Sequence, residues 1–392
     1  MMNIACYLMT AKLVTESPLH IGSGKRTGII RHTLPYVPGS FLRGAFGLSL
    51  IRLGCEKEYS ELYVDDGGKS SNIYFRHSYP RHASCKSDGT FLPTPLYMFR
   101  CKNPQCNEIY DRLIPPEQCE KDHPGTKSLE PVKGFLCNGQ SCRELKDQPV
   151  TIGRIVSTAI DRNTGSAKQI MLQQEQAEEQ GKVGTLHAMD VIETGTEFIV
   201  EILLSRKAGE HLKFAENLLQ NSLTDAGIGG SKSRGLGKVK IEKIAVKTIT
   251  TDLLEQRADE IDSSDFMIRL VSPMVLKRDE PKDDQFLSSR KLLEACRQAY
   301  TWCFHEGKPK LPDAEEVHLK AKRFSFETFS GWSLKTNMRR DVLGTVSAGS
   351  VFEFERKPRD ENFALALAAL EFHAVGDFKP HGCGQVVIEK VR

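Results

Sequence analysis

A glycine-rich and basic stretch is the part of the sequence best suited to bind an anion. The segment Gly227–Lys238, GIGGSKSRGLGK, has five glycines in twelve positions, with Lys232, Arg234 and Lys238 between them. Glycine is used where φ must be positive or where another part of the backbone comes close. Successive N–H groups in such a loop can surround an anion, and basic side chains add charge. We therefore expect a phosphate-binding loop here.

The segments on either side indicate which elements position this loop. Glu197–Leu204, EFIVEILL, has the pattern of a half-buried strand, and VKIEKIAV after the loop has it again. Between the first strand and the loop, apolar residues recur at helical spacing, namely Leu212, Ala215, Leu218, Leu219 and Leu223. The loop therefore joins a helix to a strand, whereas a P-loop or Rossmann turn joins a strand to a helix, and GxxxxGK[ST] is absent. This order argues against nucleotide hydrolysis.

Cysteine is abundant, with eleven residues in the chain. Disulfides rarely persist in a reducing cytosol, so the clustering of five cysteines in one short segment indicates metal binding. CKNPQC and CNGQSC are two Cys-x4-Cys knuckles, and two such pairs supply the four thiolates that structural zinc prefers. We expect one structural zinc site, formed by Cys101, Cys106, Cys137 and Cys142. Cys119 and His123 are alternative ligands that would replace one pair, and chance free thiols are the other alternative.

The composition is typical of a soluble globular protein. The chain has 392 residues, of which 39% are hydrophobic and 27% charged, and a formal net charge of +3. A sizeable core and two domains are expected at this length. The net charge is weak support for nucleic-acid binding, which needs a local basic stripe. No apolar run reaches membrane-spanning length and the N-terminus lacks a signal-peptide pattern, so we expect a cytoplasmic protein without a membrane partner.

A second candidate anion site lies at a predicted helix start. In YVPGSFLRG, Tyr36–Gly44, Pro38 and Gly39 turn the chain and Ser40 is a favourable N-cap residue. The N-terminus of this helix would bind an anion beside Arg43. The alternative is an ordinary capped helix with a surface arginine.

Two further segments carry cations in positions suited to RNA. Arg154, Arg162 and Lys168 flank a DRNTG turn in a predicted long hairpin, although a solvated surface hairpin would have the same composition. Trp332 lies close in sequence to Arg339 and Arg340, and an aromatic ring beside cations can stack on a base and hold phosphates. A tryptophan buried in the core is the alternative.

One pattern of strands, helices and glycine turns occurs twice, which indicates an internal duplication. FMIRLVSPMVL in the second half resembles AKLVTESPLHI in the first, and each half ends with a strand, a helix, a glycine turn and a strand. We expect an α+β protein with two ferredoxin-like domains in tandem, RRM-like with the split βαβ pattern. The expected ranges are 1–249 for the first domain, with a Cys-rich zinc-binding insertion at 55–150 and a projecting hairpin at 151–191, and 265–392 for the second domain. Residues 250–264 between them are expected to form a linker or a short exposed helix.

Taken together, the motifs resemble those of the RAMP superfamily of CRISPR-associated proteins. SPLHIGSG, YVPGSFLRG, TAIDRNTG, GIGGSKSRGLGKV, GWSLK, RRDVLGTVSAGSVF and GCGQVVI follow one another in the order expected of that family. Their order, with the paired domains and the insertion, is most similar to the Cas5-group subunits named Csx10 of type III-D effector complexes. The resemblance implies a non-catalytic subunit that binds the 5′ handle of the guide RNA (crRNA) and caps the complex backbone in antiviral defence. Its partners would be crRNA, the backbone RAMP subunits and the large subunit.

The resemblance also implies which residues face the RNA. The helix-start motif falls on Pro38, Gly39, Ser40, Arg43 and Gly44, and the hairpin motif on Ile160, Asp161, Arg162 and Thr164. The glycine-rich loop of the family falls on Gly229, Gly230, Lys232, Ser233, Arg234, Gly235, Gly237 and Lys238. The second glycine turn, HGCGQ from His381, lacks the Arg and Lys content of the first loop, so a structural turn is expected there.

An enzyme of the same superfamily is the main alternative. RAMP relatives such as Cas6 include metal-independent endoribonucleases that process CRISPR repeat RNA. Their chemistry needs a general base for the 2′-hydroxyl and an acid for the leaving oxygen, which His20 beside Lys25, or His187, would supply. A zinc-stabilised scaffold unrelated to CRISPR, with no affinity for RNA, is a third hypothesis.

Overall fold

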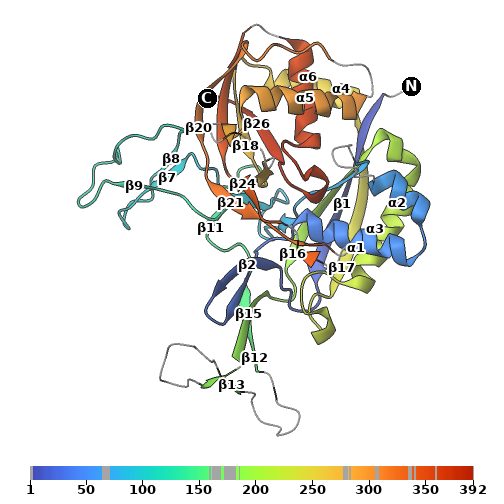
Figure 1. The fold of residues 1–392 in the computed structure, drawn as a ribbon. Coiled ribbons are helices and arrows are strands. Elements are labelled where there is room, and N and C mark those ends of the chain that lie inside the picture. Colours follow the sequence, from blue (N-terminus) through green and yellow to red (C-terminus); the bar gives the residue numbers. More distant parts are fainter. Residues whose placement is uncertain are drawn as a thin grey trace.

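The computed structural model shows a mixed α+β fold with several antiparallel sheets (Figure 1). It describes residues 3–63, 71–158, 160, 169–171, 182–184, 186–276, 281, 284–304, 309–333, 338–339, 341–357 and 360–391. No helix in these ranges is long and apolar enough to cross a membrane. The α+β class expected from the sequence is confirmed.

The first half of the chain forms a sheet around its N-terminal strand. The elements are β1 (Ile4–Thr15), α1 (Gly39–Arg52), α2 (Glu56–Tyr63), β4 (Ile73–Phe75), β5 (Tyr79–Pro80), β16 (Glu197–Ser205), a 3-10 turn η1 (Arg206–His211), α3 (Leu212–Ala226) and β17 (Val239–Thr250). The sheet order is β17-β1-β16-β4, with β5 paired to β16, and the neighbours are antiparallel. Met9, Ala11 and Leu13 alternate along β1 and are buried, as expected for an apolar strand face. The strand, helix, loop and strand predicted around the glycine-rich segment are therefore confirmed.

The second half forms a sheet of the same kind. Its elements are β18 (Asp265–Leu270), α5 (Ser289–Phe304), β20 (Val317–Arg323), β25 (Val351–Arg356), α6 (Glu361–His373) and β26 (Val386–Lys390). The order in space is β20-β25-β18-β26. If the strands of each sheet are numbered along the chain, both sheets have the spatial order second, third, first, fourth. Because a helix follows the first strand and another precedes the fourth, both halves have the β-α-β-β-α-β order.

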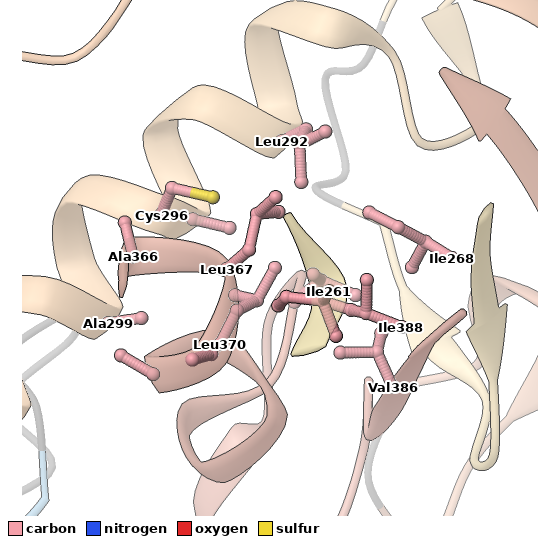
Figure 2. Close-up of a cluster of buried hydrophobic side chains, with 14 of the residues drawn as sticks. Ile261, Ile268, Leu292, Cys296, Ala299, Ala366, Leu367, Leu370, Val386 and Ile388 are labelled. Carbon is pink, nitrogen blue, oxygen red and sulfur yellow. The ribbon is translucent and has the colours of Figure 1, made fainter. Parts of the chain in front are cut away.

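The segment expected to be a linker is mostly a helix, α4 (Thr251–Ile261). Its N-terminus is capped by Thr250, whose side chain accepts a hydrogen bond from the backbone of Leu253. Leu254, Ala258 and Ile261 are buried in the core of the second half, where Ile261 lies beside side chains of α6 and β26 (Figure 2). Of the two expectations for residues 250–264, a linker or a short exposed helix, the structure shows the helix, but one of its faces is apolar and packed.

Two hydrophobic cores lie on opposite sides of the first sheet. One is formed between that sheet and α1 to α3. The other is formed by α4, α5, α6 and the second sheet, and it also includes Tyr74 and Leu203 of the first sheet. Trp302 of α5 donates a hydrogen bond to the carbonyl oxygen of Ser71 at 3.2 Å, and its ring packs edge-on against Tyr74. The two halves thus share a core and do not depend on a flexible connection.

The insertion after α2 has only short strands. Its two three-stranded sheets are β11-β10-β6 and β8-β7-β9. Their bounds are β6 (Phe91–Pro93), β7 (Met98–Cys101), β8 (Ile109–Asp111), β9 (Leu129–Pro131), β10 (Phe135–Cys137) and β11 (Leu145–Lys146). The β7-β8-β9 sheet extends away from the rest of the molecule (Figure 1). This region therefore has little opportunity to bury apolar surface.

A further four-stranded sheet, with the order β12-β15-β3-β2, leads into the projecting hairpin (Figure 1). Its strands are β2 (Gly22–Thr27), β3 (Ile30–Thr33), β12 (Ile152–Thr158) and β15 (Leu186–Ile192). The remaining elements are β13 (Gln169–Met171), β14 (Lys182–Gly184), η2 (Lys232–Arg234), β19 (Met274–Val275), β21 (Phe326–Phe329), β22 (Trp332–Ser333), β23 (Met338–Arg339), β24 (Leu343–Val346) and η4 (Lys379–His381).

Candidate nucleic-acid interface

The glycine-rich loop packs against the segment that follows β1. The N–H of Gly230 donates to the carbonyl oxygen of His20 at 2.9 Å, and the N–H of Gly237 donates to that of Pro18 at 3.0 Å. Within the loop, Ile228 donates to the carbonyl oxygen of Gly237 at 2.9 Å. These three N–H groups are satisfied by the protein, so they hold the loop in place and are not part of the expected cradle of backbone donors.

Two glycines of the loop are required by close packing as well as by their backbone conformation. A Cβ atom on Gly237 would lie 2.0 Å from the carbonyl oxygen of Ile228, and one on Gly229 would lie 2.5 Å from that of His20. Gly235 has an equally positive φ of 84°, but nothing lies within 4 Å of its Cβ position. The loop is thus a tightly packed turn at Gly229 and Gly237 and an open one at Gly235.

The basic side chains of the loop are exposed. Lys232, Arg234 and Lys238 all face solvent, and Arg52 at the end of α1 lies near Lys232. Partial burial and the charge of Arg52 lower the pKa of Lys232 below its ordinary value. Within the described part of the chain none of these four cations forms an ion pair. The loop therefore presents positive charge on a rigid backbone, and an approaching phosphate would relieve the repulsion between Lys232 and Arg52.

Arg52 was not singled out from the sequence. It is the basic residue in the last turn of α1 and belongs to no motif. Nothing in its spacing indicates that the end of α1 meets a loop formed by residues 227–238. The contact follows from the packing of α1 against α3, which the sequence alone does not reveal.

A charged network links the loop to the β12-β15-β3-β2 sheet. The Nδ1 atom of His20 donates to the carbonyl oxygen of Asp190 at 2.8 Å. The carboxylate of Asp190 accepts from Nδ1 of His32 at 2.7 Å and from Nε of Arg154 at 2.9 Å. Burial alone would raise the pKa of Asp190, but these two hydrogen bonds lower it below the ordinary value. The carboxylate of Asp190 therefore stays ionised between His32 and Arg154, while its backbone carbonyl holds His20, which is 8% exposed.

The three residues considered for catalysis are separate in the structure. His20 is buried against Gly230, whereas Lys25 is exposed on β2 and His187 is exposed on β15. No hydrogen bond joins any two of them in the described residues. His20 therefore takes part in the packing of the glycine-rich loop.

The predicted helix-start site is buried. Pro38, not Ser40, is the N-cap residue of α1, and no side chain caps the helix. Gly39 donates its N–H to Nδ1 of His77 at 3.2 Å, and a Cβ atom on Gly39 would lie 1.9 Å from the carbonyl oxygen of Phe75. The guanidinium of Arg43 is 4.1 Å from the ring centroid of Tyr63, and Arg43 is 6% exposed. The expectation of an anion site at Ser40 and Arg43 is corrected, because protein atoms occupy the helix N-terminus.

The second glycine turn covers this helix start. A Cβ atom on Gly382, which has a φ of 91°, would lie 2.4 Å from Nδ1 of His77 and 2.7 Å from the carbonyl oxygen of Phe75. The carbonyl oxygen of His381 would lie 2.8 Å from a Cβ atom on Gly39. The turn thus holds the C-terminal half against the first sheet, in agreement with the structural role expected for it.

Acid should destabilise this contact through His77. Burial lowers the pKa of His77 to about 3, from an ordinary 6.5 in the unfolded chain. Above pH 6.5 His77 is neutral in both the folded and the unfolded state. Below pH 6.5 the imidazole is protonated in the unfolded chain but stays neutral in the folded protein, so the free energy of unfolding falls. The loss should reach about 2 kcal/mol by pH 5. Urea unfolding between pH 7 and pH 5, compared with that of His77→Gln, measures it; parallel pH dependences for the two proteins would contradict this prediction. Glutamine keeps an acceptor for Gly39 and does not titrate here.

Several expected RNA contacts lie outside the described residues. Arg162, Lys168 and Arg340 are among these, and for Trp332 and Arg339 only the backbone is described. The backbone pairs Trp332 of β22 with Arg339 of β23. The proposed stacking and phosphate contacts of these side chains therefore remain predictions.

The four cysteines expected at one metal site belong to two separate groups. Cys101 and Cys106 lie with Cys119 and His123, and within this group all ligand atoms are within 4.8 Å of one another. The same holds for a second group, which consists of His82, Cys85, Cys137 and Cys142. The single four-cysteine site is thus corrected. His82 and Cys85 were missed, although their spacing, His-x2-Cys, is a recognisable ligand pattern.

Comparison with known protein families identifies the chain. Residues 12–240, more than half of the sequence, match the RAMP superfamily. The chain belongs to the RAMP superfamily. None of the curated proteins compared with this RAMP protein matches it.

Solved structures similar to this RAMP protein include a Cmr-beta chain and two Cas6 product complexes. A chain of the type III-B Cmr-beta complex bound to cognate target RNA is 15% identical with a TM-score of 0.34, and the match covers 62% of this chain and 61% of that one. A Cas6 product complex is 11% identical with a TM-score of 0.42, and the match covers 98% of this chain and 100% of that one. A second Cas6 product complex is 13% identical with a TM-score of 0.40, and the match covers 97% of this chain and 100% of that one.

The RAMP protein also has a cleft of about 530 Å³ between the first sheet, β26 and the insertion. Three of the four Lys and Arg residues that line it are paired with acidic neighbours. Lys12 pairs with Glu197 at 3.0 Å, Arg81 pairs with Glu197 at 2.9 Å, and Arg76 pairs with Glu201 at 3.0 Å. This cleft is therefore less suited to a phosphate backbone than the exposed cations of the glycine-rich loop.

Proposed function

We propose that this RAMP protein is a non-catalytic RNA-binding subunit of a type III CRISPR effector complex, of the Cas5-group Csx10 kind in type III-D. It would bind the 5′ handle of crRNA and cap the backbone of the complex. In this proposal the two sheets are tandem ferredoxin-like domains, and the Cys-rich insertion holds structural zinc. The backbone RAMP subunits and the large subunit are the expected protein partners.

The observation that carries the proposal is the set of exposed cations on a fixed loop. Lys232, Arg234 and Lys238 have no ion-pair partner in the described residues, whereas Lys12, Arg76 and Arg81 of the cleft do. Phosphate contacts supply most of the affinity of proteins for RNA. A rigid loop also loses little conformational entropy when the RNA binds.

The basic surface continues from the loop onto the neighbouring sheet. The hydroxyl of Ser231 lies 4.0 Å from Sδ of Met189 on β15. Met189 is opposite Arg31 on β3, and Arg31, Lys25 and Arg26 are all exposed. A single strand crossing from the loop to β3 would meet cations along its path, which favours RNA over a small anion.

A salt series tests this proposal. The double variant Lys232→Ala/Arg234→Ala should bind CRISPR-repeat RNA more weakly. Since each phosphate contact with a single strand contributes about 0.7 to the slope of log K against log salt, this slope should become shallower by about 1.4. Fluorescence anisotropy with repeat and scrambled RNA, at several salt concentrations, measures both quantities.

The matched control is Lys57→Ala/Lys213→Ala. These lysines are 78% and 79% exposed and are paired with Glu61 and Glu216 on α2 and α3. This control should bind RNA like the wild type. An unchanged slope in the loop variant would contradict the proposal, and metal-independent cleavage of the RNA on a gel would favour the endoribonuclease.

A further inference from the structure

The two Cys/His groups of the insertion have the dimensions of tetrahedral zinc sites. A tetrahedron with Zn–S distances of 2.3 Å has sulfur atoms about 3.8 Å apart, and with Zn–N near 2.05 Å its S···N distance is about 3.6 Å. In the first group the Sγ atoms of Cys106 and Cys119 are 3.8 Å apart, and Sγ of Cys101 is 3.4 Å from Nε2 of His123. In the second group Sγ of Cys142 is 3.5 Å from Nδ1 of His82.

Both histidines are oriented as metal ligands. In the first group Nδ1 of His123 lies 3.3 Å from the carbonyl oxygen of Pro124, so the nitrogen away from the thiols can donate there. In the second group Nε2 of His82 lies 3.1 Å from a carboxylate oxygen of Glu144. Metal-bound histidines almost always donate their other N–H to a carbonyl or a carboxylate in this way.

Backbone N–H groups also donate hydrogen bonds to the cysteine sulfur atoms. The N–H of Asn103 donates to Sγ of Cys101 at 3.4 Å, and the N–H of Gly139 donates to Sγ of Cys137 at 3.4 Å. The two knuckles thus have the same N–H···S hydrogen bond, from the second residue after the first cysteine. Such bonds favour a thiolate over a thiol.

Two glycines leave room for the thiols of the second group. A Cβ atom on Gly89 would lie 2.6 Å from Sγ of Cys137, and one on Gly139 would lie 2.3 Å from Sγ of Cys85. Neither glycine has a positive φ, so the backbone conformation does not require glycine at these positions. The requirement is the space that a set of converging thiols occupies.

The insertion has too little apolar core to order these groups by packing. The buried residues of the first group form one small cluster, Phe99, Cys101, Tyr110 and Cys119. Those of the second are Cys85, Phe91 and Cys137. Regions with so small a core usually depend on a metal or disulfides, and the thiols here form no disulfide.

We propose that the insertion binds two structural zinc ions, each by three thiolates and one histidine. Each site takes up Zn²⁺ with a neutral imidazole and releases three thiol protons, which leaves a Zn(Cys)3(His) centre with a charge of −1. Both coordination shells are complete, so the ions have no open position for catalysis. This inference does not depend on RNA binding.

The two ions hold different parts of the insertion. The first group lies at the end of β7 and in the two loops that join β7 to β8 and β8 to β9, so it orders the outer β7-β8-β9 sheet. The second group joins the segment after β5 to the loop after β10. His82 follows Arg81, whose N–H donates to the carbonyl oxygen of Glu197 on β16 at 2.9 Å. The second zinc therefore fixes the base of the insertion to the first sheet.

Metal stoichiometry of the purified full chain tests the proposal. Wild-type protein should contain two zinc ions per chain by native mass spectrometry and elemental analysis. Cys119→Ser and Cys85→Ser should each contain one, the double variant none, and the control Cys55→Ser two, because Cys55 belongs to neither group. Proteolysis of Cys119→Ser should cut only within residues 98–132, whereas Cys85→Ser should be cut across the insertion.

Cobalt titration of zinc-depleted wild-type protein gives a second measurement that requires no variant. The thiolate-to-cobalt absorption should saturate at two equivalents. Saturation at one equivalent, or a wild-type content of one zinc per chain that falls to zero in each single variant, would establish a shared site and overturn the proposal. Metal-free wild-type protein that takes up no cobalt would also overturn it. RNA affinity is a separate readout, so failure of the RNA proposal is distinguishable from failure of this one.

Discussion

Replacing Gly237 with alanine should destabilise the protein by about 3 kcal/mol and weaken RNA binding roughly tenfold or more. Alanine in the left-handed region costs about 1–2 kcal/mol, and Gly237 has a φ of 78°. The new Cβ atom would also lie 2.0 Å from the carbonyl oxygen of Ile228, and relief of such an overlap costs about 1–3 kcal/mol more. The loop would have to move, and its cations would move with it. Urea unfolding and RNA titration at fixed salt measure the two effects.

The control for this variant is Gly235→Ala. Gly235 has a φ of 84°, so the conformational cost is the same, but its Cβ position is open. We expect a loss of only about 1–2 kcal/mol and nearly normal RNA affinity. If both variants lost the same stability, close packing of the loop would not be the reason for Gly237.

The sequence located this loop but could not explain it. Five glycines among cations predicted an anion cradle of backbone N–H groups. The structure uses these donors on Pro18 and His20, which are more than 200 residues away in the chain. A contact over such a distance leaves no local pattern, because glycines that approach an anion and glycines that approach another backbone have the same composition. The exposed Lys and Arg side chains are the part of the prediction that the structure retains.

For the metal ligands, too, the sequence predicted the local pattern but not the tertiary contacts. Local spacing identified both Cys-x4-Cys knuckles, because the two thiols of one knuckle must lie on one turn. How the pairs combine is a tertiary property, and the structure joins each knuckle to a different partner segment, one containing Cys119 and His123 and the other His82 and Cys85. Arg43 is a third example, since no pattern distinguishes a surface arginine from one stacked on Tyr63.

The sequence allowed a short helix between the two sheets but did not predict that one face of it is buried, and this burial leads to a second large effect. Residues 250–264 are mostly polar, but a single face of α4 is buried, and Arg257 on this helix binds Glu371 of α6. Nε and Nη2 of Arg257 donate to the two carboxylate oxygens at 2.8 and 2.9 Å. The backbone N–H of Ile388 also donates to this carboxylate at 2.9 Å. The Glu371 carboxylate raises the pKa of Arg257 above its ordinary value.

Glu371→Ala should therefore lower the free energy of unfolding by about 2 kcal/mol. Glu371 is 16% exposed at its side chain and Arg257 31%, so the loss is smaller than the 3–5 kcal/mol expected for a fully buried pair. The control Glu260→Ala removes the other carboxylate on Arg257, at 3.0 Å, but Glu260 is 66% exposed and its loss should cost less than about 0.5 kcal/mol. Urea unfolding of both variants measures the difference, and hydrogen exchange should show faster opening of α4 in Glu371→Ala only. Equal, small effects would mean that α4 is held by its apolar face alone. A large loss confined to Glu371→Ala would establish that the segment between the two sheets is a stabilising part of the shared core and not a hinge.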